Sequence, residues 1–163
     1  MTEITFWSLS VVLSALLSYA TCANAQEANC TDTSYGWAFN SLGLSPCRVA
    51  EQLASPCNIN VSITQLPNIS YAYFGPPAGE ADPCRCSSVY YSLLAGCAAC
   101  QDANWMRWNN YTQNCSTVYL TIFPSPIPSG TKVPHWAYLN VSIDGEFDPT
   151  EAAAGGRGRS FDA

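Results

Sequence analysis

Apolar residues recur at helical spacing in residues 47–54. Ser45 suits the N-cap of a helix and Pro46 suits its first position, while Pro56 should end the helix at or before Ser55. The pattern predicts an amphipathic helix that turns cysteines toward the core, because four side chains at spacings of three, four and three share one face. These are Cys47, Ala50, Ala54 and Cys57.

Three further segments show helical signals. We expect helices over residues 87–101, capped by Ser87 or Ser88, and over residues 104–114, and a shorter helix over residues 34–42, closed by Gly43. The simplest architecture is therefore a small, mainly α, disulfide-rich fold of about four short helices cross-linked through their buried sides. The predicted apolar faces are Cys86, Tyr90, Leu93, Cys97 and Cys100 on the second helix, and Trp105, Trp108, Thr112 and Cys115 on the third.

The remaining segments lack helical periodicity. Residues 58–83 form a long, proline-rich loop, which holds either a short strand at 71–74 or the binding surface. Residues 116–148 read as an extended, proline-rich arm that packs on the helices through four large side chains, and residues 149–163 as a disordered tail. The four packing side chains are Tyr119, Ile122, Trp136 and Tyr138.

Residues 1–25 resemble a signal peptide. The stretch from 6 to 20 is apolar, too short to span a bilayer comfortably, and Ala23 and Ala25 supply a small-x-small site for cleavage before Gln26. Glu3 stands where a basic residue is usual, so a signal anchor and an N-terminal core helix remain alternatives. No apolar run of 18 residues follows, so we expect no transmembrane helix in this chain after cleavage. The expected domain is residues 26–148.

Cysteine parity supports cleavage. The chain has nine cysteines, and Cys22 would leave with residues 1–25. The remaining eight span residues 30–115, and an even number in a short secreted chain predicts four disulfides. Cys84 and Cys86 should find different partners, because alternate residues of an extended segment point to opposite sides. The connectivity is left open among 105 possibilities. The eight are Cys30, Cys47, Cys57, Cys84, Cys86, Cys97, Cys100 and Cys115.

Six Asn-x-Ser/Thr sequons indicate glycosylated surface loops behind a signal peptide. Two of them, at Asn29 and Asn114, have cysteine in the middle position, where disulfide formation competes with glycan transfer. The other four are at Asn60, Asn68, Asn110 and Asn140.

Charge narrows the functional classes. The net charge is −6, charged residues make up 11% of the chain and aromatic residues 12%. A chain this poor in charge and rich in aromatics is unlike a disordered protein. Its negative net charge gives no basic surface of the kind that binds nucleic acid or anionic lipid.

No convergent catalytic or metal site emerges from the residue types. Cys97 and Cys100 have redox spacing but lie at the C-terminal end of a predicted helix, where the dipole disfavours a thiolate. Grouped with Cys84 and Cys86 they would suit zinc in a reducing compartment, whereas secreted cysteines usually oxidise. The single histidine, His135, lacks a nucleophile partner.

Two other clusters also have simple structural explanations. The acidic groups lie in loop-like sequence and read as solvated turns rather than a glycosidase pair. Trp105 and Trp108, with Tyr111, are expected in the core rather than on a ligand platform. We therefore expect neither an enzyme nor a bound cofactor or metal. The acidic groups are Glu80/Asp82 and Asp144/Glu146/Asp148.

Several short motifs resemble a family of basidiomycete fungal cysteine-rich ectodomains over about residues 34–150. They are Asn40 to Cys47 (NSLGLSPC), Cys84-Arg-Cys86, Tyr91-Ser-Leu93, Cys97-Ala-Ala-Cys100-Gln101, Asn114 to Thr117 (NCST), Ile127 to Thr131 (IPSGT) and Pro134 to Leu139 (PHWAYL). The resemblance implies a secreted or single-pass membrane protein, since members place this domain before a Ser/Thr-rich stalk and one transmembrane helix. Residues 152–163 contain neither, so a membrane anchor would need residues beyond Ala163. The family supplies no activity.

The second half of the cysteine pattern is also similar to fungal CFEM domains, in which an aspartate before a Cys-x-Cys ligates haem iron. Asp82 before Cys84 and Cys86 resembles that order, whereas the spacing of Cys30, Cys47 and Cys57 differs. This resemblance implies a haem or small-ligand carrier that uses Asp82.

The sequence thus predicts a non-enzymatic glycoprotein domain, secreted or at the cell surface, that recognises an extracellular ligand or a cell-surface or cell-wall component. The carrier of CFEM type and a structural cell-wall protein are the two alternatives.

Overall fold

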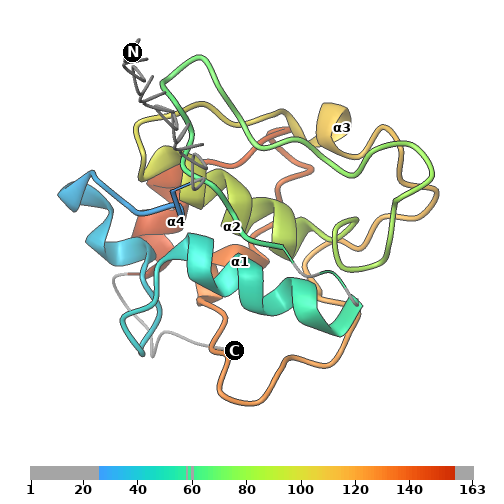
Figure 1. Cartoon of the computed structure of the whole chain (residues 1–163), viewed down its shortest axis with the longest axis horizontal. Coiled ribbons are helices and arrows are strands. Elements are labelled where there is room, and N and C mark those ends of the chain that lie inside the picture. Colours follow the sequence, from blue (N-terminus) through green and yellow to red (C-terminus); the bar gives the residue numbers. More distant parts are fainter. Residues whose placement is uncertain (1–25, 58, 60, 157–163) are drawn as a thin grey trace, which may run out of the picture.

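The computed structural model describes residues 26–57, 59 and 61–156, which fold into short helices joined by long loops (Figure 1). This part of the chain forms no β-strand, only isolated bridges between Glu27 and Thr64 and between Ser87 and Tyr119. The expected small, mainly helical, disulfide-rich fold is confirmed. The α-helices are α1 (Pro46–Ala54), α2 (Ser88–Ala99), α3 (Trp108–Tyr111) and α4 (Pro149–Gly156), and the 3₁₀ helices are η1 (Thr33–Ala38), η2 (Ser55–Cys57) and η3 (His135–Tyr138).

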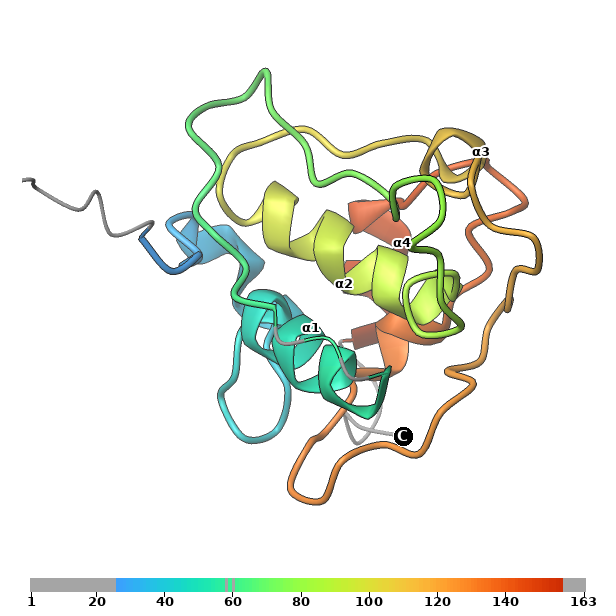
Figure 2. The ribbon, with the colours of Figure 1, turned by 45° about the vertical axis from the view of Figure 1, so that its right-hand side comes forward.

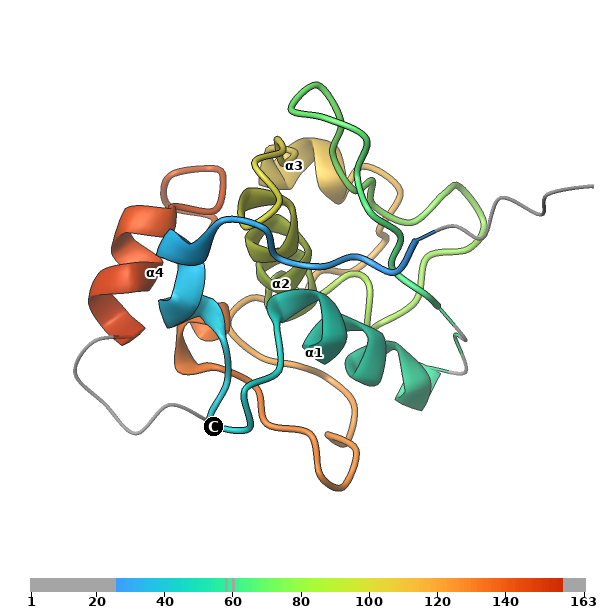
Figure 3. The ribbon, with the colours of Figure 1, turned by 60° about the vertical axis from the view of Figure 1, so that its left-hand side comes forward.

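Helix α2 lies in the middle of the molecule, with α1, α3 and α4 on different sides of it (Figures 2 and 3). Every one of its twelve residues is buried, as expected of a helix that is apolar all round. The hydroxyl oxygen of Ser87 accepts a hydrogen bond from the amide of Tyr90 and caps the helix, as the sequence predicts.

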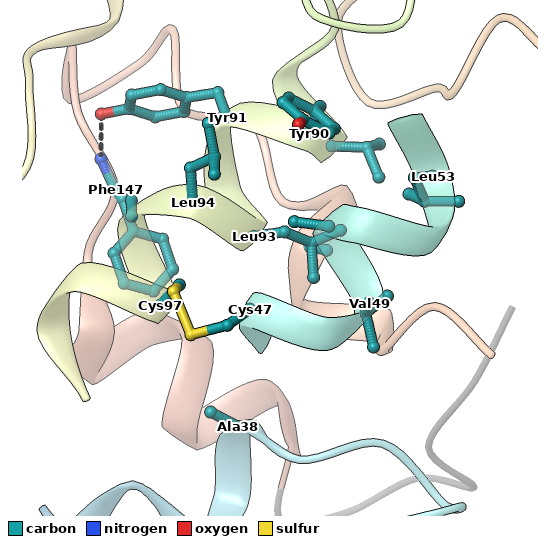
Figure 4. Packing of buried hydrophobic residues seen from close by; sticks show 14 of the residues in the cluster. Ala38, Cys47, Val49, Leu53, Tyr90, Tyr91, Leu93, Leu94, Cys97 and Phe147 are labelled. Atoms are coloured by element: carbon teal, nitrogen blue, oxygen red, sulfur yellow. Dashed lines mark hydrogen bonds between the residues drawn. A yellow bond between two sulfur atoms is a disulfide. The ribbon is translucent and has the colours of Figure 1, made fainter. Parts of the chain in front are cut away.

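Helix α1 packs against α2 along the face that its periodicity predicts. Ser45 caps it by accepting a hydrogen bond from the Arg48 amide, and Pro46 occupies its first turn. Cys47, Ala50 and Ala54 of that face are buried, and the Cys47–Cys97 disulfide joins α1 to α2 (Figure 4); Val49 and Leu53 beside the face are buried as well.

The arm of residues 116–148 covers another side of α2 through η3. Trp136 is buried and donates a hydrogen bond from Nε1 to the carbonyl of Ala38. Its ring lies over Gly96, where an added Cβ would come within 2.8 Å of Trp136 Cη2. Ile122, predicted to pack on the helices, is instead 53% exposed, because the arm meets the helices at residues 119 and 131–138 and bows outward between them.

All eight cysteines of residues 30–115 form disulfides, with Cα separations between 4.8 and 6.1 Å. The predicted pairing within the domain is confirmed, and Cys84 and Cys86 do take different partners. The pairs are Cys30–Cys100, Cys47–Cys97, Cys57–Cys84 and Cys86–Cys115.

Two predicted helices are shorter than expected. The helix predicted over 104–114 is wrong except for the single turn of α3, because the amides that would start it bind other loops: Asn104 donates to the carbonyl of Tyr71 and Trp108 to that of Gly145. The helix predicted over 34–42 ends with η1. Beyond it, the side-chain oxygen of Asn40 accepts hydrogen bonds from two amides of the following turn.

The prediction of a disordered tail from residue 149 is wrong for α4. Asp148 caps this helix, since its Oδ1 accepts hydrogen bonds from the amides of Thr150 and Glu151. Ala152 and Ala153 are buried, and α4 packs against η1 and η3. Residues 157–163 lie outside the described residues.

The segment predicted to be a signal peptide, residues 1–25 with Cys22, also lies outside the described residues. Among the helices that are described, none is both long enough and apolar enough to cross a membrane.

Candidate functional site

The most prominent feature outside the core is the long loop, residues 61–83, which passes over α2 without forming a strand, including at residues 71–74 (Figure 2). Hydrogen bonds to three other segments hold its first half. The amide of Ile63 donates to Glu51 Oε1 on α1, the amide of Ala28 donates to the carbonyl of Ile63, and the amide of Leu66 donates to Gln101 Oε1 beyond α2. The loop is therefore a fixed wall although it has no regular structure.

The second half of the long loop is held as firmly. The hydroxyl of Tyr73 donates to the carbonyl of Thr64 and accepts from Gln101 Nε2, which ties the two halves together. Asn114 Nδ2 donates to the carbonyl of Pro76 at 2.9 Å. Gly75 lies against the backbone carbonyl of Tyr111 so closely that an added Cβ would overlap it, so only glycine fits there.

Between the long loop and α2 lies a cavity of about 270 Å³, which we call the loop cavity. Its rim contains exposed residues such as Phe74, which is 77% exposed, so the cavity opens at the surface. Its walls are mostly apolar and aromatic, and Arg85 is the one charged residue among the described residues that line it. The loop contributes Val61, Ser62, Ile63, Thr64, Tyr73, Phe74, Gly75, Pro76 and Pro77; Arg85, Tyr90 and Leu94 come from in and around α2, and Tyr111 from α3.

Tyr111 stands out among the lining residues. Its side chain is buried, and its hydroxyl finds no hydrogen-bond partner in the described part of the chain. A buried hydroxyl without a partner costs about 1–3 kcal/mol, so such a group calls for an explanation. A molecule in the loop cavity that offered an acceptor or donor to Tyr111 would recover that free energy.

Tyr90 and Arg85 lie close enough to Tyr111 to influence its ionisation. Burial raises the pKa of Tyr111 well above 10, and the Tyr90 hydroxyl raises it further, while Arg85 lowers it. Burial likewise raises the pKa of Tyr90 to about 12, again opposed by Arg85. Both phenols are therefore neutral hydrogen-bonding groups at physiological pH.

Arg85 is held in place beside the cavity. Its Nε pairs with Asp82 Oδ2, and its Nη2 donates to the carbonyl of Glu80. These bonds leave Nη1 without an acceptor among the described residues. The guanidinium is thus oriented through Nε and Nη2, while Nη1 remains available as a donor.

Comparison with family models, with curated proteins and with solved structures finds no match to this chain. Function must therefore be argued from the site.

The cysteines leave no thiol for chemistry in this framework. Cys97 and Cys100, which have redox spacing, pair with Cys47 and Cys30 rather than with each other, and all four are buried or half-buried. The four cysteines considered as a zinc site each belong to a different disulfide. Asp82 lies near the sulfurs of Cys57 and Cys84, but those two sulfurs are bonded to each other.

Asp82, the residue that the CFEM resemblance implies as a haem ligand, is engaged within its own turn. Its Oδ1 accepts a hydrogen bond from the Arg85 amide and its Oδ2 pairs with the Arg85 side chain. The cavity beside it measures about 130 Å³, less than the roughly 150 Å³ of an engineered cavity that holds benzene, so haem is far too large for it.

His135 and the acidic groups do not converge on the loop cavity. His135 is exposed at the start of η3. Asp148 caps α4, while Asp144 lies exposed in the preceding loop and Glu146 is half-buried there. Trp108 and Tyr111 are buried, as predicted, and Trp105 is half-buried with its ring against Phe147.

The five sequon asparagines that the structure describes are all exposed, and Asn60 lies outside the described residues. In two of them the side-chain oxygen accepts a hydrogen bond from the amide two residues on: Asn68 from Ser70 and Asn140 from Ser142. Asn114 differs, since its side-chain nitrogen already holds the long loop through Pro76.

Sequence reasoning identified residues 58–83 as a possible binding surface but missed the residues that complete the cavity. Tyr90 and Tyr111 carry apolar helical patterns, so they read as core residues. Arg85 is the middle residue of a Cys-x-Cys motif, so the sequence pattern gives no sign that it lines a cavity. Only the three-dimensional approach of the long loop brings them together.

Proposed function

We propose that this chain is an extracellular, non-enzymatic ligand-binding domain, and that the loop cavity is its binding site. The proposal is carried by Tyr111, a residue of the cavity lining whose buried hydroxyl has no hydrogen-bond partner among the described residues. Apolar walls with a few convergent polar groups are typical of small-molecule sites.

The surroundings of the cavity support binding rather than catalysis. Its lining includes one cation and three tyrosines, but neither an acidic residue nor the histidine. A general base or an activated nucleophile therefore has no counterpart in the described lining. Four disulfides among the described residues and a run of exposed sequons suit a glycoprotein that is secreted or displayed at a cell surface.

Rigidity also favours a binding site. The long loop is fixed by Glu51, Gln101, Asn114 and the Cys57–Cys84 disulfide. A preformed wall reduces the ordering cost of binding, because the loop need not become ordered when a ligand enters.

A fragment screen by protein-observed NMR tests the proposal on the secreted, disulfide-intact protein. We expect compounds of about 8–14 heavy atoms to bind saturably and to shift resonances of the long loop and of residues near Leu94. Leu94→Phe, which adds volume at the cavity wall, should abolish those shifts. Val118→Phe, an equally apolar change at an exposed position of the arm, should leave them intact. Shifts that survive Leu94→Phe, or a screen without any saturable binder, would refute the site.

A further inference from the structure

We infer that the ligand of the loop cavity is a small carboxylic acid with an apolar body, whose carboxylate lies against Arg85, Tyr90 and Tyr111. The inference rests on the proposed function and adds the chemical class of the ligand.

The size of the cavity limits the ligand. An engineered apolar cavity of about 150 Å³ holds benzene, which has six heavy atoms. At the same density, 270 Å³ corresponds to about eleven heavy atoms. This is the size of one aromatic ring with a short side chain, or of a medium-length acyl chain.

The walls decide the polarity of most of that ligand. The long loop contributes the aliphatic side chains of Val61 and Ile63 and the rings of Pro76 and Pro77, and α2 contributes Leu94. These surfaces gain free energy when an apolar body displaces water from them. A small, highly polar ligand such as a sugar would leave its hydroxyls unpaired against them.

The polar groups that act on one another within the lining, Arg85, Tyr90 and Tyr111, decide the head group. Arg85 keeps Nη1 without an acceptor among the described residues, and its other nitrogens are oriented by Asp82 and Glu80. A planar guanidinium held in this way matches a carboxylate. The hydroxyls of Tyr90 and Tyr111, neutral at physiological pH, can both donate to carboxylate oxygens.

The nearby anions, Asp82 and Glu51, do not line the site. Asp82 is absent from the lining of the loop cavity and instead lines a separate, smaller cavity. It therefore pairs with Nε of Arg85 without occupying the loop cavity, and Nη1 remains as a donor for a second anion. Arg85 is the one charged residue in the described lining, so the wall itself places no negative charge against a carboxylate, and Asp82 and Glu51 act on Tyr90 only from outside the lining.

Two probes of equal size and shape test the class: 3-phenylpropanoate and its neutral counterpart 3-phenylpropanamide. Isothermal titration at pH 7 on the secreted, disulfide-intact protein gives the two dissociation constants. We expect the carboxylate to bind at least tenfold more tightly than the amide, because hydrogen bonds between charged groups are about twice as strong as neutral ones.

Variants at Arg85 attribute the preference. Arg85→Gln should reduce the ratio of the two constants to about one, while Arg85→Lys, which keeps the charge, should retain part of the preference. Arg107→Gln removes the same charge from an exposed position outside the cavity lining and should leave the ratio unchanged. Amide NMR spectra of each variant report whether the fold is kept.

The outcomes separate the two proposals. Equal binding of both probes, with loop-cavity shifts that Leu94→Phe abolishes, would overturn the carboxylate inference and leave the binding site standing. A tenfold preference that persists in Arg85→Gln would also overturn it, since the charge would then be recognised elsewhere. Failure of 3-phenylpropanoate to bind at 5 mM contradicts the inference about ligand class, whereas failure of the whole fragment screen contradicts the site itself.

Discussion

Single glycines fix two of the closest approaches in this molecule. At Gly96, in the middle of α2, the indole of Trp136 occupies the space that a Cβ would need. At Gly75 the obstacle is the backbone of α3 itself. A neighbouring side chain can shift a little, whereas a backbone carbonyl within a helix cannot, so the two positions should respond differently to substitution.

Gly96→Ala tests the packing of the arm on α2. In an exposed helix this change stabilises by up to about 1 kcal/mol, but here we expect a net loss of about 1 kcal/mol or more, because overpacking a core typically costs 1–3 kcal/mol. Gly155→Ala in α4, where an added Cβ meets nothing within 4 Å, should be neutral or stabilising. Urea denaturation measures both, and equal effects of the two substitutions would contradict the close approach of Trp136.

Gly75→Ala tests the wall of the loop cavity. The added methyl group must push the long loop away from Tyr111, so we expect weaker binding of any cavity ligand together with a loss of about 1–3 kcal/mol in unfolding free energy. Gly36→Ala is the matched control, since its Cβ would lie in open space. Titration with a fragment from the screen provides the binding measurement, and unchanged affinity in Gly75→Ala would show that this contact does not shape the site.

At the scale of elements, local capping signals were the most reliable guide. Ser45 and Ser87 predict the starts of α1 and α2, and the structure places both caps there. The same signals precede α4: Asp148 at the cap, Pro149 after it and Glu151 three residues on. They were outweighed by the Ala- and Gly-rich composition that follows, which reads as low complexity.

Other elements depend on contacts that no local pattern contains. The helical periodicity of residues 104–114 is real in the sequence, yet the amides of Asn104 and Trp108 are taken by distant carbonyls. Likewise α2 was expected to bury one face and is buried on all sides, because the arm and the long loop cover the rest. Helix propensity cannot predict that distant carbonyl groups will compete in this way for the backbone amides of a helix.

The long loop supplies a prediction at this scale, centred on Gln101. Gln101→Ala removes the acceptor for the Leu66 amide and the donor to the Tyr73 hydroxyl, so we expect a loss of about 1–3 kcal/mol. Hydrogen exchange at Leu66 should also become faster. Gln113→Ala, at an exposed position after α3, should change neither. Unaltered exchange at Leu66 in Gln101→Ala would mean that the loop is held by other contacts.

For the whole molecule, the even number of cysteines predicted that all eight would form disulfides, but not which cysteines would pair. Parity and helix faces required only that the sulfurs meet. The observed nesting, with Cys57–Cys84 inside Cys47–Cys97 and that pair inside Cys30–Cys100, depends on how α1 packs on α2. The loop cavity likewise forms only when Cys57 and Cys84 are joined by a disulfide and the segment between them folds over α2.

Removing single disulfides should separate stability from binding. Closing a loop of 27 residues is worth about 3.5 kcal/mol and one of 50 residues about 4 kcal/mol in the chain-entropy model. We therefore expect both the Cys57→Ala/Cys84→Ala and the Cys47→Ala/Cys97→Ala proteins to lose several kcal/mol. The first should lose fragment binding even under conditions where it stays folded, because its bridge closes the segment that forms the cavity wall. Retained affinity in that variant would contradict this role.

Ionisation of buried tyrosines should limit stability at alkaline pH. Burial raises the pKa of Tyr90 and of Tyr91 to about 12, against 10 in the unfolded chain. Between these values the unfolded chain binds fewer protons than the folded one, so the tyrosine contribution is intact below pH 10 and is lost as pH rises toward 12. Denaturation at pH 8 and pH 11 should show the fall, with a smaller fall in Tyr90→Phe. Equal stability at the two pH values would argue against this burial.

The central claim is that the loop cavity binds a ligand and that Tyr111 takes part. Tyr111→Phe in one protein preparation tests it with two readings: the dissociation constant for 3-phenylpropanamide or the tightest fragment, and the unfolding free energy. Since the hydroxyl has no partner among the described residues, its removal should leave stability unchanged or higher, while binding weakens about tenfold. Tyr138→Phe, at a half-buried position outside the cavity lining, should alter neither reading. A loss of stability above about 1 kcal/mol with unchanged binding would contradict the account, because the hydroxyl would then serve the fold and not a ligand.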